Sequence, residues 1–325
     1  MSYIDLHCDT IMALCGSKTK YSLKDAPIQI NIDKLIKGDC CLQCFAMFVP
    51  FKVPNPFETC MEMIDRYYLE IEANNEYIAP AFNYNDIINN KENGKISSLL
   101  TIEEGGVTKC NLSFLRDFYR LGVRMICLNW NFINGVGHPN FTYEKDKKPD
   151  FKTPNTKDGL TDFGFEMVKE MNKLGMIVDV SHLSDKGFWD VINTTNKPIV
   201  ASHSNARGAC NHVRNLTDEM IIALHKNGGV MGMNYCASFL NENEEIGKNT
   251  IDEVIRHMKY IKNLVGVDVI ALGSDFDGIE PDIELRDASL MPNLIEKMRE
   301  TGFNEEEIAK ITHLNFLRVA KEVLK

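Results

Sequence analysis

Eight short apolar or β-branched runs recur along the chain, and each ends in polar residues before a longer stretch with helical spacing. Strands that alternate with helices are typical of βαβ units and a parallel sheet. Eight repeats fit a closed (β/α)₈ barrel of the TIM type better than an open doubly wound sheet. The runs are YIDLHCD, CLQCFAMFV, SLLTIEE, VRMICLNW, MIVDVSH, PIVASHS, GVMGMNY and VIALGSDFD.

The stretches between the runs carry recognisable helix signals. Residues 57–73 are amphipathic, and Thr250 followed by Glu253 predicts a capping box that opens a helix reaching residue 264. Gly228 and Gly229 should end the helix that precedes them. Residues 304–324 have a helical period and are expected to form the final outer helix of the barrel.

Two polar stretches interrupt the alternation, at residues 135–158 and 241–249. Both follow predicted strands, where a barrel carries its active-site loops, so they are candidate rim elements; tolerated surface insertions are the alternative. No linker, internal repeat or low-complexity tract indicates a second domain. We therefore expect residues 1–325 to form one barrel domain.

Composition narrows the class of partner. Hydrophobic residues make up 44% of the 325 residues, enough for a large core, and the formal net charge is −10 without any basic block. This balance argues against nucleic acid and anionic membranes as partners. The first sixteen residues lack a basic leader, and charged residues interrupt their apolar stretch, so we expect neither a signal peptide nor a spanning helix.

Ten cysteines are spread irregularly through the chain. With no secretion signal, this distribution predicts free thiols in a reducing, cytoplasmic compartment. Cys40, Cys41 and Cys44 contain a CxxC spacing, but they lie in an apolar run with no second ligand pair nearby. Buried strand cysteines are the better interpretation of this cluster.

Metal-ligand residue types recur where the predicted strands end. The ends read His7-Cys8-Asp9, Glu103-Glu104-Gly105-Gly106, Asp179-Val180-Ser181-His182, Ser202-His203-Ser204 and Asp275-Phe276-Asp277-Gly278. The carboxyl ends of barrel strands meet at one mouth, where catalytic groups gather. Each motif alone has a structural alternative, such as a hydrogen-bonded histidine or a turn at Asp277-Gly278. Their joint placement favours a metal site.

The spacing suggests how two metal ions could be held. His7 and Asp9 point to the same side of a strand, so both can bind one ion. His182 and His203, from neighbouring strands, could bind a second, and a carboxylate between the pairs could bridge them. Such ligands suit catalytic Zn²⁺, and two ions about 3.5 Å apart suit hydrolysis. His225 and His257 lie in helical patterns and are expected at the surface.

Nine segments in this order resemble the membrane (renal) dipeptidase family of zinc metallopeptidases and its bacterial relatives. They span nearly the whole chain, and their common order makes the match specific. The segments are DLHCDT, EEGG, LGVRMICLNWN, DGLTDFG, VDVSHLSD, VASHSNAR, HVRNLTDE, ALGSDFDG and NFLRV.

The resemblance implies two zinc ions per chain, one held by His7 and Asp9 and the other by His182 and His203. It implies that Glu104, the residue directly before the glycine pair, bridges them, and that Glu103 points to the opposite side of the strand. A hydroxide that bridges the metals would attack the peptide carbonyl.

Further roles follow from the same resemblance. Asp275 would move the proton to the leaving amine, and Arg214 would grip the C-terminal carboxylate of a dipeptide, with Arg207 as its competitor. D-residues at the C-terminal position of the substrate are one possibility. A homodimer is implied as well.

One position departs from the family. Where the animal enzymes carry a histidine on the fourth strand, this chain has Trp130, whose indole can donate a hydrogen bond but cannot carry a proton. We expect Trp130 and Tyr235 to contact the substrate. The departure bears on substrate preference, while the predicted metal ligands are all present.

Three rival interpretations remain open. One is a different binuclear amidohydrolase acting on a cyclic amide, lactone or phosphoester, although no lysine lies within the eight runs to serve as a carboxylated bridge. Another is a relative that binds metal without turning over substrate. In the third, the motifs are purely structural and no metal binds.

Overall fold

Nine parallel strands form a single sheet in the computed structural model, which describes residues 1–16, 21–50, 52–141 and 150–325. Eight of the strands coincide with the eight predicted runs and follow one another in chain order around the sheet. They are β1 (Tyr3–Asp5), β2 (Cys40–Phe48), β4 (Ile96–Glu103), β5 (Met125–Cys127), β6 (Ile177–Asp179), β7 (Val200–Ala201), β8 (Val230–Met233) and β9 (Ile270–Leu272).

The first and last strands approach each other and nearly close the barrel. The backbone N–H of Leu6 donates to the carbonyl of Leu272 at 2.9 Å, and Asp9 N–H donates to Phe276 O at 2.9 Å. The predicted (β/α)₈ class is therefore confirmed. A ninth strand, β3 (Ile78–Pro80), was not predicted; it is three residues long and, among the described strands, pairs only with residues 96–98 at the start of β4.

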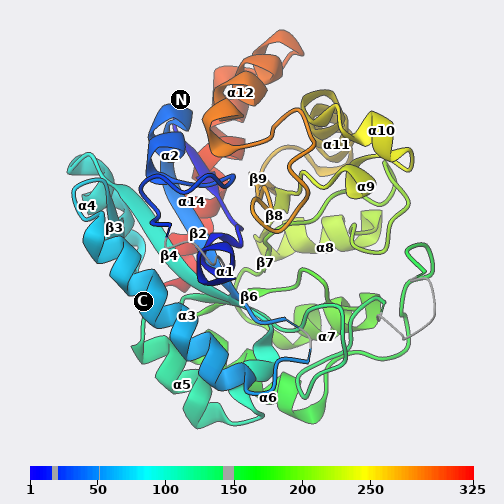
Figure 1. The fold of residues 1–325 in the computed structure, drawn as a ribbon. Coiled ribbons are helices and arrows are strands. Elements are labelled where there is room, and N and C mark those ends of the chain that lie inside the picture. The colour runs from blue at the N-terminus through cyan, green and yellow to red at the C-terminus, as the bar shows by residue number, and fades with distance from the viewer. Residues whose placement is uncertain (17–20, 51, 142–149) are drawn as a thin grey trace.

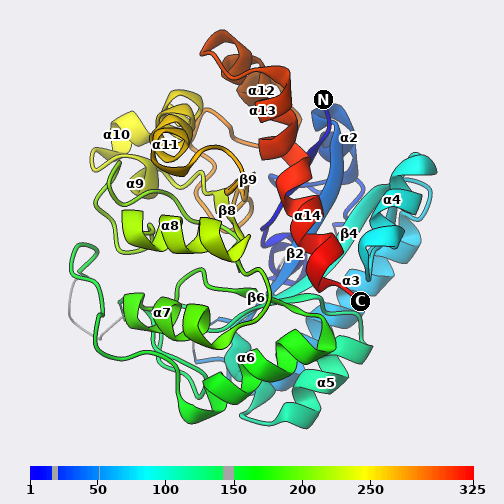
Figure 2. The same ribbon diagram turned by 180° about the vertical axis from the view of Figure 1, so that it is seen from behind.

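Helices surround the strands and connect them in sequence (Figures 1 and 2). They are α1 (Thr10–Gly16), α2 (Ile32–Gly38), α3 (Pro56–Ala73), α4 (Tyr84–Glu92), α5 (Leu112–Arg120), α6 (Asp162–Leu174), α7 (Asp185–Thr194), α8 (Asp218–Asn227), α9 (Ala237–Leu240), α10 (Glu244–Gly247), α11 (Thr250–Val265), α12 (Met291–Glu300), α13 (Glu305–Ala309) and α14 (Asn315–Val323). Short 3₁₀ helices span Gly105–Thr108 and Ala288–Leu290, and a π-helical turn spans Lys310–Leu314.

Apolar side chains form two separate clusters. The larger lies between the strands and the surrounding helices, and the smaller fills the inside of the barrel. Phe316, Val319 and Val323 of α14 belong to the smaller cluster, together with inward-facing strand residues such as Leu42 and Leu99. The prediction that this last segment is an outer helix was wrong: α14 covers the end of the barrel opposite the strands' carboxyl ends (Figure 2).

The helix-end predictions were partly correct. Gly228 adopts a left-handed conformation with φ of 79° and ends α8 as expected. Thr250 begins α11, but Asn249 precedes it as the cap residue and makes no side-chain capping bond, so the predicted box is wrong. A capping box does form at Asn304 and Glu307, at the start of α13.

The cysteines are all free thiols. Cys40 and Cys44 are buried within β2, and Cys41 is half-buried, which confirms their interpretation as strand residues. Within the described part of the chain, no helix combines the length and the apolar character needed to cross a bilayer.

Candidate active site

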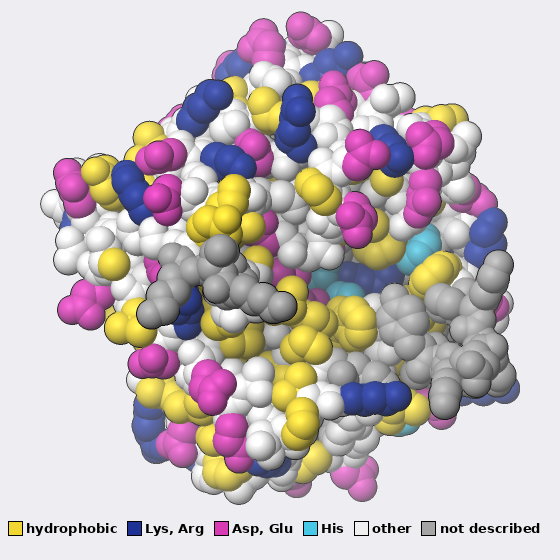
Figure 3. Space-filling view, viewed as in Figure 1, with side chains coloured by type: hydrophobic (Ala, Val, Ile, Leu, Met, Phe, Trp, Pro, Cys, Tyr) yellow, Lys and Arg dark blue, Asp and Glu magenta, His cyan; other side chains and the backbone are white. Residues whose placement is uncertain are grey.

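The carboxyl ends of the strands enclose a cavity of about 340 Å³. Figure 3 shows it as a hollow in which histidine and basic side chains lie between apolar ones. Five predicted residues line the cavity: Asp9, Trp130, His182, Arg214 and Asp275. His7 and His203 lie buried beside them. Side chains that are far apart in the sequence therefore meet at one mouth, as the barrel interpretation predicts.

Glu103 lies at the centre of the predicted ligands. One of its carboxylate oxygens is 2.9 Å from His182 Nε2 and 3.4 Å from His203 Nε2, and the other is 3.3 Å from His7 Nε2. Asp9 Oδ2 is 3.9 Å from the same His7 nitrogen. The carboxylate thus joins a His7–Asp9 group to a His182–His203 group.

The predicted bridging role of Glu104 is contradicted by this geometry. The Glu104 carboxylate accepts hydrogen bonds from Asn134 Nδ2 at 2.6 Å, Gly106 N–H at 2.7 Å and Trp130 N–H at 3.1 Å. The Glu104 carboxylate therefore bonds to the turn after β4 and to the loop after β5, and not to the histidines. Its φ of 112° shows that the chain has already left the strand at this residue.

The alternation along β4 could have identified the correct glutamate. Leu99 packs inside the barrel, whereas Leu100 and Ile102 pack against the surrounding helices. Successive side chains of a strand point to opposite faces, so Glu103 shares the inner face with Leu99. The expectation that Glu103 faces away was wrong because it relied on the position next to the glycine pair.

Two atoms at this centre that could bind a metal ion lack hydrogen-bond partners among the described residues. Within the part of the chain that the structure describes, His7 Nε2 and Asp9 Oδ1 make no hydrogen bond, although both are buried. His182 Nε2 and His203 Nε2 lie 2.9 Å apart. Burial, reinforced by the nearby His7 and Arg214, lowers the pKa of both rings well below the usual value, so both are neutral. Lone pairs and carboxylates that converge in this way fit divalent metal ions.

Burial shifts the pKa values of the carboxylates in the opposite direction from those of the two histidines. Burial raises the pKa values of Glu103 and Asp275 despite their attraction to His7. Burial opposes a charge on His7, but Glu103 and Asp9 outweigh it and raise the pKa of His7 well above its usual value. Three carboxylates therefore surround His7, the imidazole in which proximity to Glu103 and Asp9 favours a positive charge, and bound metal ions would supply further positive charge.

Arg214 projects its guanidinium into the cavity. It is buried, its Nη2 donates to His203 O at 3.3 Å, and its Nε and Nη1 have no hydrogen-bond partner among the described residues. The competing Arg207 is already engaged by Asp185 through two hydrogen bonds of 2.7 and 2.8 Å. Of these two arginines, only Arg214 can bind a carboxylate in the cavity.

Asp275 lies on the opposite side of the histidine cluster from Trp130. Asn234 Nδ2 donates to Asp275 Oδ2 at 2.9 Å, while Asp275 Oδ1 is 3.8 Å from His7 Nε2. This places one oxygen towards the cluster and anchors the other. Asn234 was not predicted from the sequence, although its alternation with Val230 places it on the inner face of β8.

Trp130 forms part of an aromatic wall. Its ring centroid lies 5.1 Å from that of Phe48 and 5.9 Å from that of His182. Phe48 ends β2 directly beside Glu103, with which it is paired in the sheet. The wall was not predicted as a unit, because the pairing of Phe48 with Trp130 depends on how the strands register.

Tyr235 does not reach the cavity, contrary to expectation. It is fully buried on the outer side of β8, with its ring centroid 5.6 Å from that of Phe276 and its hydroxyl 3.6 Å from Met291 Sδ. The neighbouring Cys236 lines the cavity instead. The reason is the same as for Glu104: successive residues along the chain point to opposite sides of the strand, so Tyr235 faces away from the cavity.

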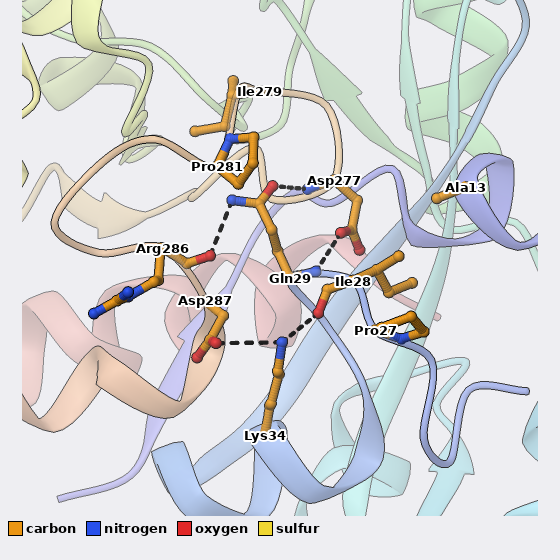
Figure 4. A pocket seen from close by; sticks show the side chains of 10 residues that line it. All are labelled: Ala13, Pro27, Ile28, Gln29, Lys34, Asp277, Ile279, Pro281, Arg286 and Asp287. Carbon is orange, nitrogen blue, oxygen red and sulfur yellow. Dashed lines mark hydrogen bonds and ion pairs between the residues drawn. The ribbon is translucent and has the colours of Figure 1, made fainter. Parts of the chain in front are cut away.

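Asp277 is joined to Gln29 by hydrogen bonds (Figure 4). Its carboxylate accepts from Thr10 Oγ1 and Gln29 N–H, each at 2.6 Å, and its own N–H donates to Gln29 Oε1 at 2.6 Å. Asp277 and Ile279 also line a second cavity of about 410 Å³. The turn interpretation of Asp277-Gly278 is consistent with these bonds.

Both predicted rim segments contribute contacts, although residues 142–149 lie outside the described residues. Lys152 Nζ pairs with Glu242 Oε2 at 2.5 Å, which joins one segment to the other. Phe151 stacks on His212, and the centroid of His212 lies 4.5 Å from that of Phe239, a cavity residue. These contacts connect the rim to the surroundings of Arg214.

His257 is not a surface residue. It is fully buried, with Nδ1 accepting from Ala206 N–H at 3.2 Å and Nε2 2.9 Å from Leu240 O. Its helical pattern concealed this role, because α11 turns the residue towards the loop that follows β7.

Comparisons with known proteins agree along the whole chain. The family model described as membrane dipeptidase, peptidase family M19, matches residues 1–325. A dipeptidase of Claviceps purpurea, tcpJ, is 30% identical over 311 residues, covering 92% of this chain and 70% of its own. A Klebsiella pneumoniae protein, described as an uncharacterized protein in the pqqA 5′ region, is 37% identical over 240 residues, covering 73% of this chain and 86% of its own.

A solved structure shows the same fold. The crystal structure of dipeptidase AC, a metallopeptidase of family M19, superposes with a TM-score of 0.89 at 26% identity and covers 100% of this chain and 99% of its own. The barrel is therefore shared over its full length.

The different positions of the two glutamates generate a test. Glu103→Gln should weaken binding of divalent metal by more than about 100-fold, beyond the cost of losing an outer-shell partner. The matched Glu104→Gln variant should keep its metal, because the Glu104 side chain bonds to Gly106 and to the loop after β5 rather than to the histidines. Metal content after dialysis, measured by mass spectrometry, distinguishes the two. Loss of metal only in Glu104→Gln would restore the original assignment.

Proposed function

Because the chain belongs to the membrane dipeptidase family, peptidase family M19, we propose that it is a binuclear zinc dipeptidase acting on dipeptides with a free C-terminal carboxylate. The observation that carries this proposal is the position of Glu103 between two groups of buried metal ligands, in the cavity into which Arg214 projects. D-residues at the C-terminal position belong to the same proposal.

The residues fit two zinc ions. His7 and Asp9 would hold one, His182 and His203 the other, and Glu103 would bind both. Unpartnered His7 Nε2 and Asp9 Oδ1, together with the two neutral imidazoles, support this assignment. When bound, zinc supplies Lewis acidity, which makes a water molecule acidic near neutral pH and polarises a carbonyl oxygen.

Arg214 selects and orients the substrate. A guanidinium can bind a carboxylate through two parallel hydrogen bonds, and Arg214 offers Nε and Nη1 for this purpose. Its burial means that the carboxylate must enter the cavity completely. A peptide bond one residue away from that carboxylate then lies over the histidine cluster, which favours dipeptides over longer chains.

Asp275 carries the proton. It accepts one from the attacking water and gives it to the leaving nitrogen, which departs as a neutral amine. The hydrogen bond from Asn234 fixes one carboxylate oxygen, so the other faces the reacting atoms. Trp130 and Phe48 line one side of the cavity, where they exclude water and form an apolar surface for the substrate.

A substrate panel tests the proposed function against its rivals. Purified protein supplemented with zinc should hydrolyse L,L- and L,D-dipeptides, with slower turnover of tripeptides and of dipeptide amides. Lactones, cyclic amides and phosphotriesters provide the comparison for a different amidohydrolase. Turnover of the latter compounds alone would overturn the dipeptidase proposal.

Arg214 should account for the recognition of the carboxylate. Arg214→Gln is expected to lower kcat/KM for a dipeptide by about 10- to 100-fold, because a hydrogen bond to a charged group contributes about 1.5–3 kcal/mol. The same variant should change kcat/KM for the corresponding dipeptide amide much less. Equal losses of kcat/KM for the dipeptide and for its amide would show that Arg214 does not recognise the carboxylate.

The Asp275→Asn variant tests whether the protein is an active enzyme or a relative that binds metal without turning over substrate. The asparagine preserves shape but cannot accept the proton, so kcat should fall by about 10²- to 10⁴-fold. Two zinc ions per chain should remain bound. Steady-state kinetics and metal analysis of the same sample measure both quantities, and unchanged kcat would exclude Asp275 as the proton carrier.

A further inference from the structure

An aspartate and a serine form the same clamp twice below the cavity. In the first, Asp5 Oδ1 accepts from Ser274 N–H at 2.8 Å and Oδ2 accepts from Ser274 Oγ at 2.6 Å. In the second, Asp179 Oδ1 accepts from Ser202 N–H at 3.0 Å and Oδ2 accepts from Ser202 Oγ at 2.5 Å. Each clamp joins a strand end to the segment leaving a neighbouring strand.

Each clamp aspartate also accepts a hydrogen bond from the backbone two residues further along the chain. Asp5 Oδ1 accepts from His7 N–H at 3.3 Å, and Asp179 Oδ1 accepts from Ser181 N–H at 2.9 Å. All four clamp residues are buried. The repetition indicates that the arrangement stabilises strand ends, and it makes any difference between the clamps informative.

The clamps differ in what contacts the serine hydroxyl. Ser202 Oγ lies 2.7 Å from His203 Nδ1. Ser274 Oγ has backbone neighbours instead: Phe276 N–H donates to it at 3.1 Å, and His7 O lies 3.3 Å away. Only the second clamp therefore connects its carboxylate to the imidazole of a predicted metal ligand.

The direction of the hydrogen bonds follows from the donors available. An ionised carboxylate can only accept, so the Ser202 hydroxyl must give its proton to Asp179. The oxygen of that hydroxyl is then an acceptor for His203, which must carry its proton on Nδ1. The lone pair of His203 is left on Nε2, which lies 3.4 Å from Glu103 Oε1 at the cluster.

We propose that Asp179 and Ser202 are positioning residues that fix the tautomer of His203, so that its Nε2 lone pair faces the metal centre. This inference rests on the proposed metal centre. His182 has a counterpart in Asn131, whose Oδ1 lies 2.7 Å from His182 Nδ1. Outer-shell partners of this kind orient metal-binding histidines.

Asp179 itself is poorly placed to be a ligand. One of its oxygens lies within 4.8 Å of nitrogen atoms of His7 and His203, so proximity alone would allow it. However, Oδ1 already accepts from two backbone N–H groups and Oδ2 from the Ser202 hydroxyl. Its contribution to the centre therefore passes through Ser202.

The decisive variant is Asp179→Asn, which keeps the shape of the side chain but reverses one bond. The amide oxygen stays with the two backbone donors, so the NH₂ group faces Ser202 and donates to it. The nearest acceptor for the freed hydroxyl proton is His203 Nδ1 at 2.7 Å, ahead of Ser181 Oγ at 3.3 Å. His203 then carries its proton on Nε2, where it blocks metal binding.

The matched control is Asp5→Asn. It makes the same change in the first clamp, where the freed proton of Ser274 can be accepted by the carbonyl of His7. Zinc affinity, measured by competition with a chromophoric chelator, should fall at least 10-fold in Asp179→Asn, within the range of about 10- to 100-fold for outer-shell partners. In Asp5→Asn it should stay within about threefold of the wild type by the same measure.

A second pair of variants removes the hydroxyl. Ser202→Ala leaves His203 Nδ1 without its acceptor but does not force the wrong tautomer, so its zinc affinity should lie between those of Asp179→Asn and the wild type. Ser274→Ala is its control. Nitrogen-15 NMR of histidine-labelled, metal-free protein gives an independent readout, with the His203 signal assigned by its loss in His203→Asn.

The outcomes separate the possibilities. A His203 that keeps its Nδ1 proton in Asp179→Asn, or equal zinc affinity in Asp179→Asn and Asp5→Asn, overturns the proposal. A purely structural role predicts that equality. If Asp179→Asn fails to fold, Ser202→Ala against Ser274→Ala decides by the same comparison. Wild-type protein that takes up zinc but hydrolyses no dipeptide overturns the proposed function alone, whereas failure to take up zinc overturns both.

Discussion

The electrostatics around Glu103 constrain the rest of the mouth. Its two oxygens lie 2.9–3.4 Å from nitrogen atoms of His182, His203 and His7, in a region from which water is largely excluded. Burial disfavours charge on each group separately, yet the groups can coexist when positive charge is shared among them. The hydrogen bonds around the cluster are consistent with this requirement for shared positive charge. Asn131 and Ser202 occupy the outer nitrogens of two rings, and Arg214 keeps its free edge towards the cavity.

The strand ends accommodate this cluster through an uncommon backbone conformation. Glu104, His182, Asp275 and Asp277 all have φ between 65° and 112°, a region that residues with a side chain enter at a cost of about 1–2 kcal/mol each. Each lies just beyond the end of a strand, where ladder hydrogen bonds cease. The aspartate–serine clamps and the bonds to Asp277 replace those ladder bonds. At the mouth, regular sheet structure therefore gives way to backbone conformations that orient these side chains towards the cavity.

The sequence predicts the barrel well because the relevant signal is local. Each of the eight runs becomes a strand, and the chemistry at their ends converges as parallel topology requires. Glu104 and Tyr235 failed for one shared reason: which side of a strand faces inward depends on alternation with neighbours such as Leu99 and Val230, and a motif does not report that alternation. The contacts of Phe48 with Trp130 and of Asp277 with Gln29 join distant segments, so only the folded chain reveals them.

The position of α14 bears on how substrate enters the site and how products leave it. This helix packs its apolar face into the end of the barrel opposite the mouth, whereas the described residues that line the cavity lie at the carboxyl ends of the strands. We therefore expect both amino acids released from a dipeptide to leave through the mouth, by the route through which the substrate arrives. In the proposed binding mode, the buried Arg214 holds the carboxylate of the carboxyl-terminal fragment. That binding mode implies that the carboxyl-terminal product competes with the next substrate for the same guanidinium.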